Sequence, residues 1–127
     1  MIFIVDDSPI DIELTTLALQ ATGLEIVVRS ATDGKTALAM LRNGLGVPAL
    51  ILLDLKMPGM SGIEVLRAIR ADDRLRDLPV VVVTSSALES DRADAFAAGA
   101  SDYMQKPLAL AQFSKDLESI VHRWLQN

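Results

Sequence analysis

The sequence contains no cysteine, little aromatic content and no long hydrophobic run. Without cysteine there is no disulfide, thiol nucleophile or thiolate metal site, which fits a reducing, cytoplasmic environment. No charged segment precedes an apolar stretch, and no apolar run reaches the roughly 18 residues of a membrane span. Positive charge is also scarce, with 12 Lys and Arg against 17 Asp and Glu and a net charge of −5. This balance disfavours binding to nucleic acid or to an anionic membrane.

Length and apolar content indicate one folded domain. The chain has 127 residues, half of them hydrophobic, which is close to the commonest domain size and argues against disorder. We therefore expect a single domain over residues 1–127 with no separate output domain. The alternative is a segment of a larger protein, since the first expected strand begins almost at Met1.

Short apolar runs alternate along the chain with segments of helical periodicity. This alternation predicts an α/β fold with a parallel sheet and right-handed crossovers. The expected strands cover residues 2–5, 25–29, 50–53, 80–83 and 102–105. The expected helices begin near residue 9 and after the loop 56–62, and otherwise cover residues 34–42, 89–98 and 110–125.

The first helix carries clear start and stop signals. Ser8 is the expected N-cap, Pro9 the first helical residue and Asp11 a first-turn acid, and Gly23 ends the helix. The residues at helical spacing that we expect to face inward are Ile10, Leu14, Leu17, Ala18 and Ala21.

Three acids follow two of the expected strands. Asp6 and Asp7 come directly after residues 2–5, and Asp54 comes directly after residues 50–53. The carboxyl ends of neighbouring strands meet at the crevice where open α/β sheets bind ligands. Three carboxylates there would repel one another without a hard divalent cation, and Mg²⁺ accepts such oxygen ligands together with phosphate oxygens. The sequence therefore predicts an acidic, metal-dependent phosphoryl site.

Two further residues complete a known pattern. Thr84 ends the fourth expected strand, and Lys106 with Pro107 follows the fifth. With the Asp6-Asp7 pair and Asp54 ahead of Met57-Pro58-Gly59, the chain resembles the receiver domains of two-component response regulators over essentially its whole length. The spacings from Asp54 to Thr84 and on to Lys106 agree with that family. The resemblance implies a flavodoxin-like, doubly wound (βα)5 fold with sheet order 2-1-3-4-5.

The resemblance also implies a role for each site residue. Asp54 is the phosphoacceptor, and Mg²⁺, for which Mn²⁺ can substitute, is held by Asp7, Asp54 and the Lys56 backbone carbonyl, with Asp6 acting through water. The residues expected to bind the phosphoryl oxygens are Thr84, through its hydroxyl, and Lys106, through its ammonium.

The resemblance also implies a conformational switch, and the residues near Asp54 predict slow hydrolysis of the phosphorylated state. Thr84 moves towards the phosphoryl group in this family and Tyr103 swings inward, past the small Ser85. In this family, the water that hydrolyses the acyl phosphate approaches past the side chains at positions 56 and 86. Here these are Lys56 and Ser86, and neither can accept a hydrogen bond from the water and also orient it. We therefore expect a long-lived phosphorylated state.

The resemblance implies particular partners. A sensor histidine kinase or a phosphotransfer protein supplies the phosphoryl group, and the face formed by residues 89–98, 102–105 and 110–125 signals to a target that the sequence does not name. The layout is similar to stand-alone, chemotaxis-type regulators and to those that serve bacteriophytochrome kinases. The last helix carries an apolar arc that predicts either a homodimer or a Trp124 folded over the core. Its members are Ile120, Val121, Trp124 and Leu125.

The resemblance implies that the protein is a signalling switch, which catalyses only its own phosphorylation and dephosphorylation. Two other activities are alternatives to this interpretation. A Mg²⁺-dependent phosphatase of the haloacid-dehalogenase type needs an acid two residues after its nucleophile, and Lys56 stands there. A flavin-binding module needs a phosphate-binding loop after the first strand, where Asp6 and Asp7 would repel the phosphate. Each site residue also has a plainer alternative. The acids and Thr84 are alternatively loop, turn or capping residues, Lys106 a solvated lysine, and Tyr103 a half-buried aromatic residue on an edge strand.

Overall fold

Five parallel strands form a single sheet in the order β2-β1-β3-β4-β5 in the computed structural model, which describes residues 1–125. The expected flavodoxin-like α/β fold and its strand order are confirmed. The strands are β1 (Ile2–Val5), β2 (Val28–Ala31), β3 (Leu50–Leu53), β4 (Val80–Thr84) and β5 (Asp102–Gln105). The helices are α1 (Pro9–Gln20), α2 (Gly34–Arg42), α3 (Gly62–Ala71), α4 (Glu89–Ala97) and α5 (Leu110–Leu125).

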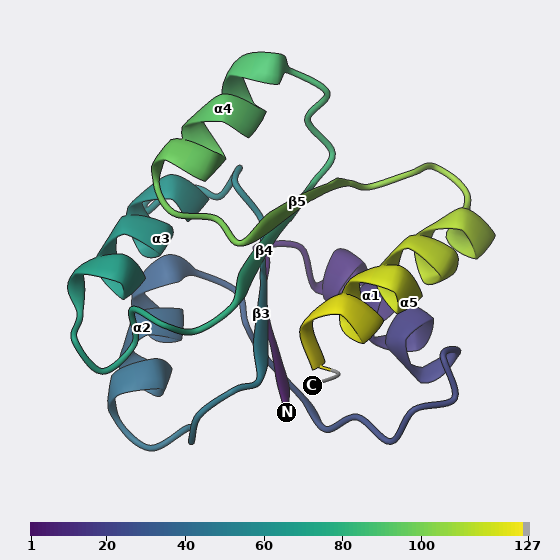
Figure 1. Cartoon of the computed structure of the whole chain (residues 1–127), viewed down its shortest axis with the longest axis horizontal. Helices are drawn as coiled ribbons and strands as arrows, with labels where there is room; N and C mark the ends of the chain where they lie inside the picture. The colour runs from purple at the N-terminus through teal and green to yellow at the C-terminus, as the bar shows by residue number, and fades with distance from the viewer. Residues whose placement is uncertain (126–127) are drawn as a thin grey trace.

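Helices cover both faces of the sheet. Helices α2, α3 and α4 lie on one side, and α1 and α5 pack together on the other (Figure 1). Strands β1, β3 and β4 are buried along their whole length, as continuous apolar runs in a doubly covered sheet require.

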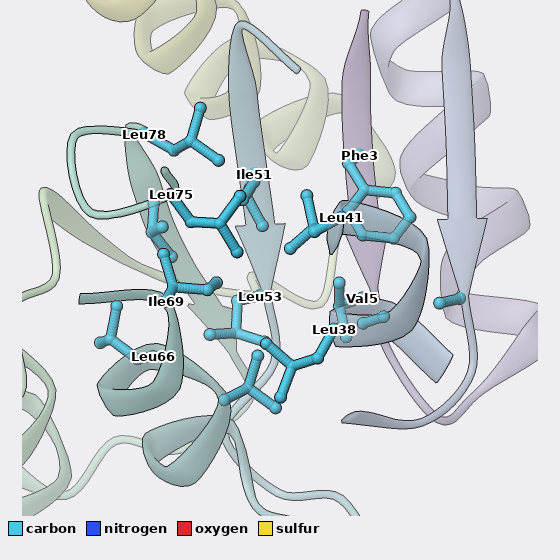
Figure 2. Close-up of a cluster of buried hydrophobic side chains, with 14 of the residues drawn as sticks. Phe3, Val5, Leu38, Leu41, Ile51, Leu53, Leu66, Ile69, Leu75 and Leu78 are labelled. Atoms are coloured by element: carbon cyan, nitrogen blue, oxygen red, sulfur yellow. The ribbon is translucent and has the colours of Figure 1, made fainter. Parts of the chain in front are cut away.

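Two apolar clusters hold the layers together. On one face, Phe3 and Ile51 of the sheet pack with Leu38 of α2 and Ile69 of α3 (Figure 2). On the other face, Leu19 of α1 and the α5 residues Phe113, Leu117 and Ile120 pack against the sheet. Each large side chain buried in this way contributes roughly 1.5–3 kcal/mol relative to remaining exposed.

The second strand begins later than the sequence predicts. The structure places it at Val28–Ala31 rather than at residues 25–29. Pairing with β1 decides this start, because Ile2 lies opposite Val28 and Val5 lies opposite Ala31. The apolar residues before Val28 belong to the connection from α1, although the Val27 carbonyl accepts from the Ile2 amide of β1 (2.8 Å).

The buried face of α1 also differs from the expectation. Ile10, Leu14 and Leu17 are exposed, whereas Thr15, Ala18 and Leu19 are buried. The helix therefore presents a different face to the sheet, and only Ala18 of the expected set lies in the core. The start signals were predicted correctly, since the Asp11 amide donates to the Ser8 hydroxyl (3.2 Å) and Pro9 opens the helix.

The connections after β1, β3, β4 and β5 all leave from the carboxyl edge of the sheet, and this edge carries the polar residues described below. Within residues 1–125, no helix is both long enough and apolar enough to cross a bilayer.

Candidate functional site

The three acids predicted from the sequence lie together at the carboxyl edge of the sheet. Strands β1 and β3 are neighbours, with Val5 opposite Leu53, so the residues that follow them are adjacent. Oxygen atoms from Asp6, Asp7 and Asp54 all lie within 4.8 Å of one another. Asp6 and Asp54 are buried, at 3% and 8% exposed, and Asp7 faces solvent. One side of the cluster is therefore closed by protein and the other is open.

The donor set fits a hard divalent cation. All three side chains offer carboxylate oxygens, which suit Mg²⁺ or Mn²⁺ and not a thiolate-binding metal. Asp7, on the open side, leaves room for the waters that Mg²⁺ retains.

Lys106 brings a positive charge into the acidic cluster. Its Nζ lies 2.8 Å from Asp6 Oδ2, 3.0 Å from Asp11 Oδ2 and 3.9 Å from Asp54 Oδ2. The backbone fixes this position, since the Lys106 amide donates to the Thr84 carbonyl (2.7 Å) just after β5. The sequence did not predict the contact between Lys106 and Asp11, because Asp11 was interpreted only as an acid in the first turn of α1.

Burial and charge shift the titration of Asp54 and Lys106. Desolvation raises the pKa of Asp54 above its ordinary value, with Lys106 opposing that shift and Asp6 adding to it. Burial alone would lower the pKa of Lys106, but its hydrogen bond to Asp6 and the charges of Asp54 and Asp6 raise it overall. Lys106 is therefore a cation at neutral pH, and its charge offsets part of the cost of burying the Asp54 carboxylate.

Thr84 and Ser86 link the site to α4 and β5. Thr84 is fully buried at the end of β4, and its Oγ1 accepts from the Ser86 amide at 3.3 Å. The Ser86 hydroxyl donates to Asp91 Oδ2 at 2.5 Å and accepts from the Leu88 amide at 3.2 Å. The Ser86 carbonyl accepts from the Tyr103 hydroxyl at 3.4 Å. Ser86, expected only to flank a water path, is therefore a junction between Thr84, α4 and β5.

Lys56 pairs with helix α4. Its Nζ lies 3.3 Å from Asp91 Oδ2 and 3.4 Å from Asp91 Oδ1. The Ser86 hydrogen bond and then Lys56 lower the pKa of Asp91 below its ordinary value. No motif in the sequence marked Asp91 as part of the site, and its position in the first turn of α4 was the only available signal.

Tyr103 is half-buried on the edge strand β5. The Arg92 guanidinium carbon lies 5.5 Å from the centre of its ring, and the Phe96 ring lies 6.4 Å away. Burial and then the charge of Asp91 raise the pKa of the Tyr103 hydroxyl. The ring and its hydroxyl are thus held by residues of α4 and of the connection after β4.

Most of the apolar arc on α5 faces the core. Ile120 and Val121 are buried, and Trp124 is half-buried against the same cluster. The Trp124 Nε1 lies 3.4 Å from Asp102 Oδ2, which also accepts from Arg123. The tryptophan is therefore tied back to the first residue of β5.

A different apolar surface lies exposed beside the site. On α1, Ile10, Leu14 and Leu17 are 70%, 39% and 48% exposed. Leu108, just before α5, and Leu110, its first residue, are also exposed. The side chains of Leu14, Lys106 and Leu108 help to line a cavity of about 230 Å³ between these segments.

The chain is similar to known proteins over nearly all of its length. The sequence model of one protein family, the response regulator receiver domain, matches residues 2–118. The probable methanogenesis regulatory protein FilR2 of Methanothrix harundinacea is 34% identical over 129 residues, which cover 98% of this chain and 83% of FilR2. The response regulator PleD of Caulobacter vibrioides is 41% identical over 107 residues, which cover 84% of this chain and 23% of PleD.

Solved structures of response regulators are also similar to this chain. The phosphorylated cyanobacterial phytochrome response regulator RcpA superimposes with a TM-score of 0.91 at 35% identity, covering 98% of this chain and 93% of RcpA. The Mn²⁺-bound response regulator Rcp1 superimposes with a TM-score of 0.87 at 32% identity, covering 99% of this chain and 94% of Rcp1.

Proposed function

The chain belongs to the family of response regulator receiver domains, which accept phosphoryl groups in two-component signalling, and we propose that its phosphoacceptor is Asp54. The observation that carries this proposal is the position of Asp54, which is nearly buried beside two other acids, with the Lys106 ammonium 3.9 Å from its carboxylate. The donor is a sensor histidine kinase or a phosphotransfer protein.

The residues around Asp54 suit an in-line phosphoryl transfer, which depends on positioning and charge neutralisation. A carboxylate oxygen of Asp54 attacks phosphorus, an acyl phosphate forms, and the donor nitrogen leaves with its electron pair. Lys106, already held beside the cluster by Asp6 and Asp11, has only to turn towards a phosphoryl oxygen. The buried Thr84 hydroxyl donates to another.

A divalent cation would be held by Asp7, Asp54 and the Lys56 backbone carbonyl, with Asp6 acting through water. When bound, Mg²⁺ or Mn²⁺ would neutralise the charge on the carboxylates and on the phosphoryl oxygens. The all-oxygen donor set supports this assignment, as does the Mn²⁺-bound state of the similar protein Rcp1.

The donor protein would dock on the apolar surface beside the site. Ile10, Leu14 and Leu17 lie one helical turn apart along α1 and are exposed, so they present a stripe to which an apolar helix can pack. Lys106 lines the cavity at the edge of this stripe. A donor seated there would bring its phosphoryl group to the open side of the acid cluster.

Readout would occur through α4, β5 and α5. The hydrogen bonds that join Thr84 to Ser86 and Ser86 to Tyr103 form a short path from the phosphoryl site to this face. A shift of Thr84 towards the phosphoryl group would pull on Ser86 and release the Tyr103 hydroxyl. The ring could then move inward, as the switch requires.

The similarity to RcpA supports a kinase of the phytochrome type as the donor. We also propose that the chain folds as one receiver domain. Ile120, Val121 and Trp124 pack against the core, so a homodimer that includes α5 would have to use the remaining, exposed part of this helix. Sedimentation at high concentration, with and without a phosphoryl mimic, tests the dimer. A monomer under both conditions would exclude it.

Labelling with acetyl phosphate tests the phosphoacceptor. The protein should gain one phosphoryl group in Mg²⁺, none in excess chelator, and none when Asp54→Asn removes the nucleophile while preserving its shape. Label on the Asn variant would move the site elsewhere. Turnover of a phosphomonoester would favour the phosphatase, and flavin absorbance would favour the flavin module.

The acyl phosphate should be long-lived, because neither Lys56 nor Ser86 carries a carboxylate or amide that can both accept from the attacking water and orient it, and Lys56 has no acceptor at all. Lys56→Asn with Ser86→Glu should shorten its lifetime by supplying groups that orient water. Equal decay in the two proteins after removal of the donor would show that these side chains do not control hydrolysis.

A further inference from the structure

Asp91 joins two loops that flank the phosphoacceptor. It lies in the first turn of α4, and its side chain is 15% exposed. Its carboxylate accepts from the hydroxyl of Ser86, in the connection after β4, and pairs with the ammonium of Lys56, in the connection after β3. One side chain on α4 therefore holds residues from both neighbouring strand ends.

This carboxylate does not cap its own helix. An acid at the third position of a helix often reaches back to the amide of the N-cap. Here the N-cap is Leu88, and its amide donates to the Ser86 hydroxyl instead. The contacts of Asp91 are directed towards the loops, so local helix stability does not explain them.

Both partners of Asp91 stand next to groups that would handle the phosphoryl group. Lys56 is two residues beyond Asp54, and the Ser86 amide donates to the Thr84 hydroxyl oxygen. A phosphoryl group on Asp54 adds negative charge close to Lys56, whose side chain is 64% exposed and free to swing. The phosphoryl group and Asp91 thus compete for the same ammonium.

We propose that Asp91 is a positioning residue that opposes phosphorylation of Asp54 by holding Lys56 and Ser86 in the unphosphorylated arrangement. This inference rests on the proposed function. When the phosphoryl group is present, Lys56 turns to it and Ser86 follows Thr84, so Asp91 loses both partners. The first turn of α4 is then free to move, which couples the chemistry at Asp54 to the α4 surface.

The test compares Asp91→Asn with the wild type. The amide keeps an oxygen for the Ser86 hydroxyl but removes the charge that holds Lys56. An ion pair with one partner this exposed changes an equilibrium by at most about fivefold. We therefore expect the ratio of phosphorylated to unphosphorylated protein, measured at limiting acetyl phosphate, to be about two- to fivefold higher in the variant. Decay after removal of the donor should slow by a similar factor.

Two companion variants separate this effect from general loosening of α4. In a Lys56→Met background, Asp91→Asn should have no further effect on labelling or decay, because the contested ammonium is gone. The matched control is Asp94→Asn, since Asp94 lines the same cavity of about 270 Å³ beside Lys56 and Asp91 but lies one turn further along α4. It should label and decay as the wild type does.

The outcomes are separable. Wild-type behaviour of Asp91→Asn, an equal effect of Asp94→Asn, or an effect that persists in the Lys56→Met background would each overturn the role of Asp91. In those cases Mg²⁺-dependent label on the wild type would still support the proposed function. Absence of that label would overturn the proposed function and this inference with it.

Discussion

At the scale of single residues, burial makes Asp54 chemically unusual. Asp6, Asp7 and Asp54 are the same residue type, yet Asp54 and Asp6 are buried and Asp7 is exposed. Desolvation of Asp54 raises its pKa, and the adjacent Asp6 raises it further against the effect of Lys106. The metal-free protein therefore carries a charge at Asp54 that its surroundings disfavour.

This shift predicts that Asp54→Asn stabilises the metal-free protein at neutral pH. A carboxyl whose pKa is raised on folding adds stability only below its unfolded pKa, and that stability is lost as the pH rises through the folded value. The melting temperature of the Asn variant should exceed that of the wild type at pH 7, and the difference should narrow as the pH falls towards 4. Melting curves in chelator from pH 4 to 8 measure this, with Asp94→Asn as an exposed control. If the difference in melting temperature between the Asn variant and the wild type did not change with pH, ionisation of Asp54 would not be its cause.

Gly62 is a second residue whose size matters. A Cβ at this position would lie 2.1 Å from the Asp54 carbonyl oxygen and 2.7 Å from the Leu55 Cα, both of them backbone atoms. Gly34 provides a matched comparison, because it also opens a helix directly after its N-cap. The Cβ there would meet only side chains, those of Val65 and Met60.

We predict that Gly62→Ala destabilises the protein by about 1–3 kcal/mol and reduces labelling of Asp54, because backbone cannot yield as side chains do. Gly34→Ala should cost less and leave labelling intact. Urea unfolding and acetyl phosphate labelling of both variants measure these effects. Equal losses in the two variants would show that the approach to the Asp54 backbone is unimportant.

At the scale of elements, Arg70 joins α3 to the connections that precede β4 and β5. Its guanidinium donates to the carbonyls of Gly99, Arg76 and Leu78, and to the Ser101 hydroxyl. The Ser101 hydroxyl also accepts from the Val80 amide. One planar group thus satisfies backbone acceptors from segments that are distant in the sequence.

Replacing Arg70 by Lys should destabilise the protein by about 1–3 kcal/mol, because an ammonium cannot reach these acceptors together. Arg67→Lys, on an exposed position of the same helix, should change stability by less than about 0.5 kcal/mol. Chemical unfolding of the two variants compares them directly. A small loss for Arg70→Lys would mean that water replaces the guanidinium without cost.

At the scale of the whole molecule, the acid cluster would couple the binding of a cation to the stability of the fold. The cluster exists only when β1 and β3 pair, so a cation that binds there favours the folded chain. The protein as a whole carries a net charge of −5, and three of its acids converge at one edge of the sheet.

Mg²⁺ at ten times its dissociation constant should therefore stabilise the fold by about 1.4 kcal/mol, a rise of roughly 3–6 °C in melting temperature. Asp7→Ala should blunt this rise by removing a ligand. NaCl at matched ionic strength is the control for screening. The metal assignment fails if NaCl produces the same rise as Mg²⁺.

The sequence alone determined the alternating elements, the family and the residues of the acid cluster. These features depend on local order: an acid directly after an apolar run, Ser8 before Pro9, and Asp54, Thr84 and Lys106 at strand ends. Parallel pairing then brings such strand ends together whatever the side chains between them. The N-cap of α1 could be predicted for the same reason, since Ser8 and Asp11 are only three positions apart.

Only the tertiary structure decided which face of α1 is buried, where β2 begins, and how Asp11 and Asp91 take part. The apolar spacing of Ile10, Leu14 and Leu17 predicts an inward face, yet the fit of α1 against the sheet and α5 places Thr15 and Leu19 inside. The contacts of Asp11 with Lys106 and of Asp91 with Lys56 join residues far apart in the chain. No local pattern encodes such contacts, because they depend on the distances that packing of the whole domain sets.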